Sequence, residues 1–174
     1  HRGVYIGFQA HASGSGSEGI AIGNQCAMNG QGQYAVAIGK KACEYQGANA
    51  VAVGGHAAWN ETASSGNGQG QGAVSIGFKA GSNKQGINAI AIGSITGYAN
   101  QPANAIAIGA RAGGNDSQDA ASIILNASGI ELGDGGNAVF AAVRKYLLLN
   151  LPLEQVIGRL QTVQGNRLLQ FVHL

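Results

Sequence analysis

The sequence has few of the residues on which most functional chemistry depends. Charged residues make up only 10% of its 174 residues, well below the usual quarter. The net charge of +2 comes without a basic run, which argues against a nucleic acid as a partner. No apolar stretch has the length needed to cross a bilayer, so we expect no direct membrane insertion. With only two prolines, a collagen-like chain or a proline-rich linker is excluded.

What the sequence does contain is one short phrase, repeated many times. Asn-Ala-Ile-Ala-Ile-Gly stands at 88–93 and again at 104–109. Phrases of this kind end at Gly7, Gly23, Gly39, Gly54, Gly77, Gly93 and Gly109. The steps between these glycines are 16, 16, 15, 23, 16 and 16 residues, and the longest step holds a polar, glycine-rich insertion at 60–72. Such self-similarity indicates a repeated structural unit rather than a catalytic motif.

Each phrase has the pattern of a short β-strand. Large β-branched residues alternate with one small residue, as in Ile90-Ala91-Ile92, and a glycine follows. A strand this short cannot bury an apolar face alone, so we expect an all-β parallel solenoid of about eight coils over residues 1–136, including an altered copy at 123–126. The large residues are expected to form its core: Ile22, Ile38, Val53, Ile76, Ile92, Ile108 and Leu125.

The small residues of the strands indicate a second buried face. In a half-buried strand that face is normally polar, yet here it is alanine in five copies: Ala21, Ala37, Ala52, Ala91 and Ala107. Tyr5 and Ser75 are the exceptions. We expect the alanines to face another copy of the chain, in a homo-oligomer arranged around the rod axis, most simply a trimer.

The C-terminal segment, 137–174, has a different composition. Nine of the eleven leucines lie in 147–174, and glycine becomes sparse after Gly136. Pro152 opens an apolar stripe of helical spacing that runs to Val163. Because a solenoid end exposes unpaired strand edges, we expect a small α+β cap or neck with one short helix here.

Several motifs with possible chemistry have simpler interpretations. Residues 14–19 match GxGxxG, but another coil strand follows instead of a helix, so we expect a turn. The histidines, none of them at metal-ligand spacing, are His1, His11, His56 and His173. A symmetry axis could gather three copies of His11 or His56, which remains an alternative. No nucleophile motif surrounds Ser122, Ser128, Lys145 or Tyr146.

Loop residues leave further alternatives open. The carboxylates of Asp116, Asp119, Glu131 and Asp134 lie in polar loops. An acid–base pair or a calcium site there is the alternative to a solvated loop. Glycosylation sequons begin at Asn60, Asn115 and Asn126. Trp59 and Asn60 open the long insertion and are the candidate surface-binding loop.

The two cysteines, Cys26 and Cys43, are seventeen residues apart. Cys26 lies three residues after its glycine, at the small inward site, and Cys43 lies four after its glycine. We expect Cys43 to point to the opposite side, so the Cβ vectors diverge and no disulfide forms. Both are interpreted as small apolar residues.

The repeated phrase, with an alanine three residues after its glycine, resembles the head repeats of trimeric autotransporter adhesins of the YadA type over roughly residues 3–126. The resemblance implies a left-handed parallel β-roll that trimerises side by side. The step of 16 is similar to repeat proteins of large DNA viruses and phages, whose arrays often close with a phrase like Ser122–Gly129. The residues after Arg144 do not resemble the chaperone peptidase that follows some such arrays.

The resemblance implies a non-enzymatic, extracellular structural protein without a cofactor. It would be a homotrimeric fibre or head segment of a virion or phage-tail appendage, bound to a host-cell surface receptor or glycan. The first alternative is the head of a bacterial trimeric autotransporter adhesin that binds host or matrix surfaces. A remote alternative is a left-handed β-helix acyltransferase, but those have hexapeptide steps and a catalytic histidine in an intersubunit cleft.

Overall fold

The computed structural model describes residues 2–10, 18–60, 68–114, 118–127 and 129. The described part is all-β and contains no helix. The expected C-terminal cap, 137–174, lies outside the described residues, as do His1, His11, His173, Asn115, Asp116, Ser128, Glu131 and Asp134.

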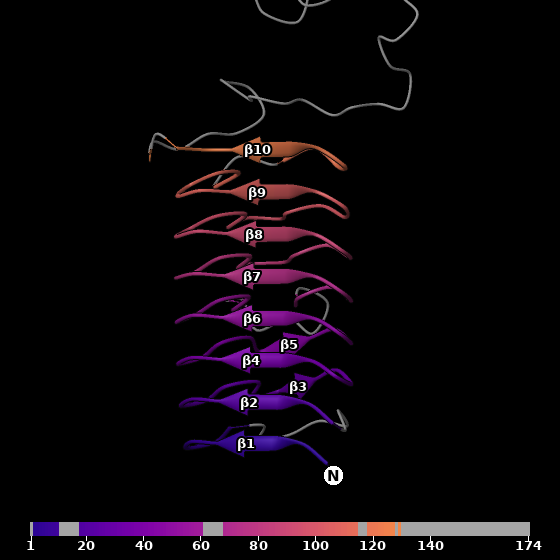
Figure 1. The fold of residues 1–174 in the computed structure, drawn as a ribbon, viewed down its shortest axis with the longest axis vertical. Helices are drawn as coiled ribbons and strands as arrows, with labels where there is room; N and C mark the ends of the chain where they lie inside the picture. Colours follow the sequence, from indigo (N-terminus) through magenta and orange to yellow (C-terminus); the bar gives the residue numbers. More distant parts are fainter. Residues whose placement is uncertain (1, 11–17, 61–67, 115–117, 128, 130–174) are drawn as a thin grey trace, which may run out of the picture. The chain divides into compact units, whose positions relative to one another are not determined.

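One parallel sheet runs along the described part, with one strand from each coil (Figure 1). Its strands, in spatial order, are β1 (Val4–Ile6), β2 (Ile20–Ile22), β4 (Val36–Ile38), β6 (Val51–Val53), β7 (Val74–Ile76), β8 (Ile90–Ile92), β9 (Ile106–Ile108) and β10 (Ile123–Leu125). Equivalent residues of successive phrases pair directly, as when Ile90 pairs with Val74 and Ile106. The predicted parallel solenoid is confirmed, with about seven turns.

A second, smaller ladder closes each coil on its other side. β3 (Gly30–Gln31) pairs in parallel with β5 (Tyr45–Gln46). Isolated bridges continue this ladder from Gln46 to Gln69, Gln85 and Gln101. Each coil is therefore held to its neighbours at two places, the three-residue strand and the glutamine turn.

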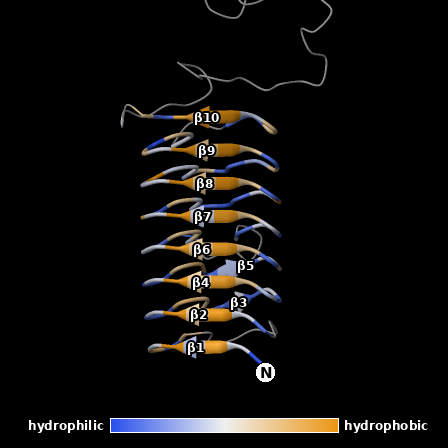
Figure 2. Cartoon of the chain, viewed as in Figure 1, coloured by the Kyte–Doolittle hydropathy of each residue, from blue (hydrophilic) through white to orange (hydrophobic). Residues whose placement is uncertain are grey.

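The structure reverses the expected assignment of the strand faces. The five alanines of the predicted trimer interface are 0% exposed within a single chain, so they cannot lie on an intersubunit surface. Of the predicted core residues, Ile22, Val53 and Ile92 are only half-buried, and the others are exposed: Ile38, Ile76, Ile108 and Leu125. Figure 2 shows these strands as an apolar band along the sheet.

The reason for this reversal is the narrow cross-section of the coil. Besides the strand alanine, each coil turns inward the residue before the strand and one or two small residues after its glycine, such as Ala89, Thr96 and Gly97. A Cβ added to Gly97 would lie 3.2 Å from the Cβ of Ala91. Because protein interiors are close-packed, this space holds side chains of about alanine size and excludes isoleucine.

Apart from Ser75, the residues larger than alanine in this column stand at its two ends. Tyr5 pairs with Ala21 in the first described coil, and its ring packs against the cluster that contains Ala21 and Cys26. Ile124 pairs with Ala107 in β10 and is 0% exposed. Each end of the column is thus filled by a side chain that the middle coils cannot accommodate.

Candidate functional site

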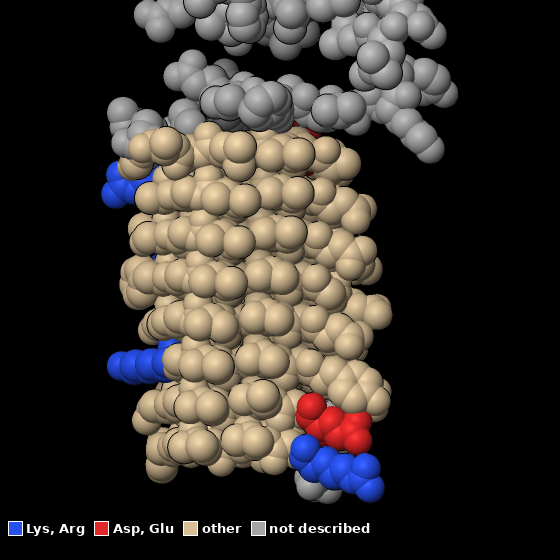
Figure 3. All heavy atoms as spheres, in the orientation of Figure 1, with Lys and Arg blue, Asp and Glu red and all other residues tan. Residues whose placement is uncertain are grey.

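The eight-stranded sheet carries an outward apolar face, which we call the sheet face. Its most exposed side chains are Val4 and Ile6 at 48% and 57%, followed by Ile38, Ile76, Ile108 and Leu125. On this side of the molecule, charged side chains of the described residues lie only near the borders (Figure 3). A continuous exposed apolar surface of this kind is typical of an interaction site.

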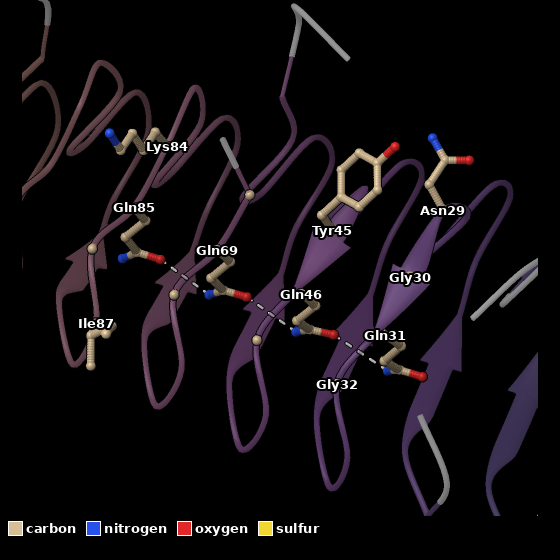
Figure 4. A pocket seen from close by; sticks show the side chains of 14 residues that line it. Asn29, Gly30, Gln31, Gly32, Tyr45, Gln46, Gln69, Lys84, Gln85 and Ile87 are labelled. Carbon is tan, nitrogen blue, oxygen red and sulfur yellow. Dashed lines mark hydrogen bonds between the residues drawn. The ribbon is translucent and has the colours of Figure 1, made fainter. Parts of the chain in front are cut away.

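A polar groove lies on the side of the molecule formed by β3 and β5, with a volume of about 650 Å³. Tyr45 and Lys84 stand on it at the same turn position, and Gly68 lies between them in the coil order. Figure 4 shows that Asn29, Tyr45 and Lys84 point away from the coil interior, whereas the glutamine side chains form a row beneath. The groove exists because the turn residues before Gln31 and Gln69 are glycines without side chains.

The row beneath the groove is a continuous ladder of buried glutamine side chains. Gln85 Nε2 donates to the carbonyl oxygens of Val74 (2.9 Å) and Ala89 (3.2 Å) and to Oε1 of Gln101 (3.1 Å). The same bonds to a strand carbonyl and to the carbonyl four residues later recur along the ladder, at Gln31, Gln46, Gln69, Gln85, Gln101 and Gln118. Several of these carbonyls also accept a backbone N–H, as Ala89 O does from Val74 N at 2.9 Å, so each glutamine amide adds a second bond to them and finds partners for its own buried polar atoms.

The sequence contained a signal for this ladder that our prediction missed. Gln-Gly recurs at 31–32, 46–47, 69–70 and 85–86, in phase with the strand phrase. By sequence alone these residues suit turns, because glutamine is polar and turns are normally exposed. The glutamine side chain is buried because each coil closes on itself. Strand periodicity carries no information about that closure.

Aromatic and cationic side chains gather around Trp59, at one border of the sheet face. The Lys41 ammonium lies 4.9 Å from the centroid of the Trp59 ring, and the Lys79 ammonium lies 5.5 Å from that of Tyr98. The ring of His56 lies between two others, 5.9 Å from Trp59 and 6.2 Å from Phe78. We call this set the lysine–aromatic patch: Lys41, His56, Trp59, Phe78, Lys79 and Tyr98.

The two residues of the predicted surface-binding loop, Trp59 and Asn60, lie in different environments. Trp59 is half-buried and belongs to the lysine–aromatic patch, but Asn60 is 1% exposed, so its expected place on a binding surface is wrong. Asn126 is 5% exposed and its Nδ2 donates to the carbonyl of Ala110 at 2.7 Å. Neither asparagine presents its amide nitrogen for glycosylation in this fold.

Both cysteine thiols are free and buried. The expectation that Cys43 points to the opposite side is wrong, because a positive φ of 58° turns this residue into the same interior that holds Cys26. Desolvation raises the pKa of Cys26 from 9.0 to about 11 and raises the pKa of Cys43 further. Neutral, inaccessible thiols of this kind are structural rather than reactive.

The other described residues that the sequence offered for catalysis or metal binding do not form a site. Asp119 is exposed in the last described turns, and the hydroxyl of Ser122 donates to the carbonyl of Asp119 at 2.7 Å. Among the described residues, no group of three His, Cys, Asp or Glu side chains could hold a metal ion. A search of the same residues finds no helix that is long and apolar enough to span a membrane.

Comparison of the chain with protein-family models, with curated proteins and with solved structures finds no match.

Proposed function

We propose that this chain is a non-enzymatic structural and attachment protein, a homotrimeric left-handed β-roll segment of a virion or phage-tail appendage. The observation that carries the proposal is the sheet face, which presents isoleucine, valine or leucine in every coil. In a solvated monomer this surface would stay exposed at a cost of about 25 cal/mol for each Å² of apolar area.

A second copy of the same chain is the partner that suits this face. Its outward residues repeat at equal positions in neighbouring coils, as Ile76 and Ile92 do. Copies aligned in parallel and in register would therefore bring apolar rows together along their whole length. A rotation axis parallel to the stack of coils would turn the sheet face of every copy toward that axis, with heterologous contacts between neighbouring copies. The number three follows the resemblance to trimeric adhesin heads.

The molar mass of the purified chain, measured by light scattering, tests this proposal. We expect a native mass near three times the 17.5 kDa of one chain and a single-chain mass in denaturant. The double variant Ile76→Lys/Ile108→Lys places two charges on the sheet face and should dissociate the assembly. It should keep the β-type circular dichroism spectrum, because neither side chain is part of the coil interior.

Ile87→Lys is the matched control for this experiment. Ile87 is 54% exposed but lines the groove on the glutamine side, away from the sheet face. Its replacement should leave the mass unchanged. A monomeric native protein, or dissociation by Ile87→Lys alone, would contradict assembly through the sheet face.

A further inference from the structure

We propose that the lysine–aromatic patch binds a linear anionic polysaccharide. This inference rests on the proposed attachment function and names the class of ligand that one surface would recognise. The patch borders the sheet face, so that self-association through that face leaves room for a ligand along the border.

The repeat places basic side chains at regular intervals along this border. Lys41, His56 and Lys79 each stand two residues after a strand-ending glycine, in successive coils. Backbone bonds from His56 N to Lys40 O (2.9 Å) and from Lys79 N to Gly55 O (3.1 Å) fix this alignment. With neighbouring coils about 4.8 Å apart, Lys41 and Lys79 lie about 10 Å apart. Arg111 continues the row two coils beyond Lys79.

The aromatic rings give the row a second recognition element. Sugar rings present apolar C–H faces, which pack on aromatic side chains, while their acidic groups pair with cations. Trp59 and Tyr98 each have a lysine ammonium over one face, so they hold the two charges in place, whereas Phe78, 52% exposed beside His56, offers an open ring. A chain lying along the row would therefore meet the two positioned charges and, between them, the Phe78 ring.

The acidic side chains of the described residues do not oppose this charge pattern. They are Glu18, Glu44 and Asp119. Glu44 comes nearest in the repeat, one coil before Trp59, but it is 3% exposed and accepts a hydrogen bond from Asn29 Nδ2. Glu18 lies beside Arg2, near the first described coil.

The spacing of the cations favours a polysaccharide over a nucleic acid. Lys41 and Lys79 lie about 10 Å apart, and Lys40 adds one further exposed lysine beside Lys41. A DNA strand carries a phosphate every 3.4 Å along the axis, so these cations would neutralise only part of its charge. A polysaccharide with one acidic group on alternate sugars has a charge density closer to that of the row.

Fluorescence titration of the purified chain tests this inference directly. Trp59 is the single tryptophan of the protein, so its emission reports on the patch. The probes are hyaluronan fragments, which carry one carboxylate on alternate sugars, neutral dextran and a single-stranded oligonucleotide of equal length. We expect hyaluronan to change the Trp59 emission, dextran to have no effect, and added salt to weaken the binding.

The double variant Lys41→Gln/Lys79→Gln supplies the charge test. Glutamine suits this backbone, because Gln9 and Gln25 occupy the same position in earlier coils with φ near the 52° of Lys41. We expect hyaluronan affinity to fall at least about tenfold. The control is Lys84→Gln, which also removes a lysine charge but from the polar groove on the β3 and β5 side. It should change the affinity by less than about twofold.

The outcomes separate this inference from the proposed function. Unchanged affinity of the double variant, or tighter binding of the oligonucleotide than of hyaluronan, would overturn the polysaccharide site. If light scattering still gives three chains, the assembly stands without this ligand. If the chain binds hyaluronan through the two lysines but is a monomer, the ligand site stands and the trimer does not.

Discussion

Gln85 and Gln101, at the same position of adjacent coils, are joined by a side-chain hydrogen bond of 3.1 Å inside the solenoid. Gln85 Oε1 in turn accepts bonds from Gln69 Nε2 at 3.1 Å and from Ser75 Oγ at 2.7 Å. One carboxamide thus connects three coils and two backbone carbonyls. The coil interior is a hydrogen-bonded column as much as a hydrophobic one.

We expect Gln85→Ala to lower the free energy of unfolding by about 3 kcal/mol, because it leaves several buried acceptors and donors without partners. The control is Gln71→Ala, at an exposed glutamine in the preceding coil, which should change it by less than about 0.5 kcal/mol. Urea unfolding followed by circular dichroism measures both. Equal effects of the two substitutions would mean that the ladder adds nothing to stability.

The inward alanines predict an unusual order of tolerance to substitution. Ala91→Val adds volume to a filled interior and should cost about 1–3 kcal/mol of stability. Ile92→Val removes a methylene from a half-buried outward residue and should cost less than about 1 kcal/mol. The two variants are compared by thermal unfolding, at a protein concentration too low for copies of the chain to associate. A larger loss of stability for Ile92→Val than for Ala91→Val would mean that the isoleucine face forms the core.

The glycine after each strand is needed for the approach of neighbouring coils. Gly77 has φ +128°, and a Cβ there would collide with the carbonyl of Gly93. Gly77→Ala should therefore destabilise the solenoid by at least about 2 kcal/mol. At Gly30 a Cβ would meet the Tyr45 ring at 3.7 Å, an ordinary contact, so Gly30→Ala should be close to neutral. Equal melting temperatures of the two variants would refute this account.

The buried cysteines predict a loss of stability at alkaline pH. In the unfolded chain a thiol ionises near its ordinary pKa of 9.0, whereas Cys26 in the folded chain ionises only near 11. Between these values the unfolded state binds fewer protons, so the free energy of unfolding falls as pH rises from about 9 to 11.

Cys26→Ala/Cys43→Ala is the comparison for this pH effect. Alanine already stands at the equivalent positions in other coils, Ala42 and Ala58, so the variant should fold. It should lose less stability over the same pH range than the natural sequence does, as measured by urea unfolding at several pH values. If the free energy of unfolding falls equally with pH in the two proteins, ionisation of the thiols does not contribute to the pH dependence of stability.

The sequence predicted the strands accurately because their signal is local. The phrases at Ile90–Ile92 and Ile106–Ile108 appear in the structure as β8 and β9, paired residue for residue. Tyr5, an exception to the alanine column by sequence, proved to stand at one of its ends. The burial of Asn60 and the grouping of Trp59 with His56 and Lys41 were not predictable, because they depend on neighbours in other coils.

By itself, the amino-acid sequence determined the period, the parallel register and the alternation of large and small side chains. Alternation states that the two faces of a strand differ, but it does not state which one is inside. The tertiary structure decided this, because a coil of about 16 residues closes around a space that admits alanine and excludes isoleucine. The same closure turned Gln85 inward, where its amide donates to backbone carbonyls, and left Ile76 outward on the sheet face.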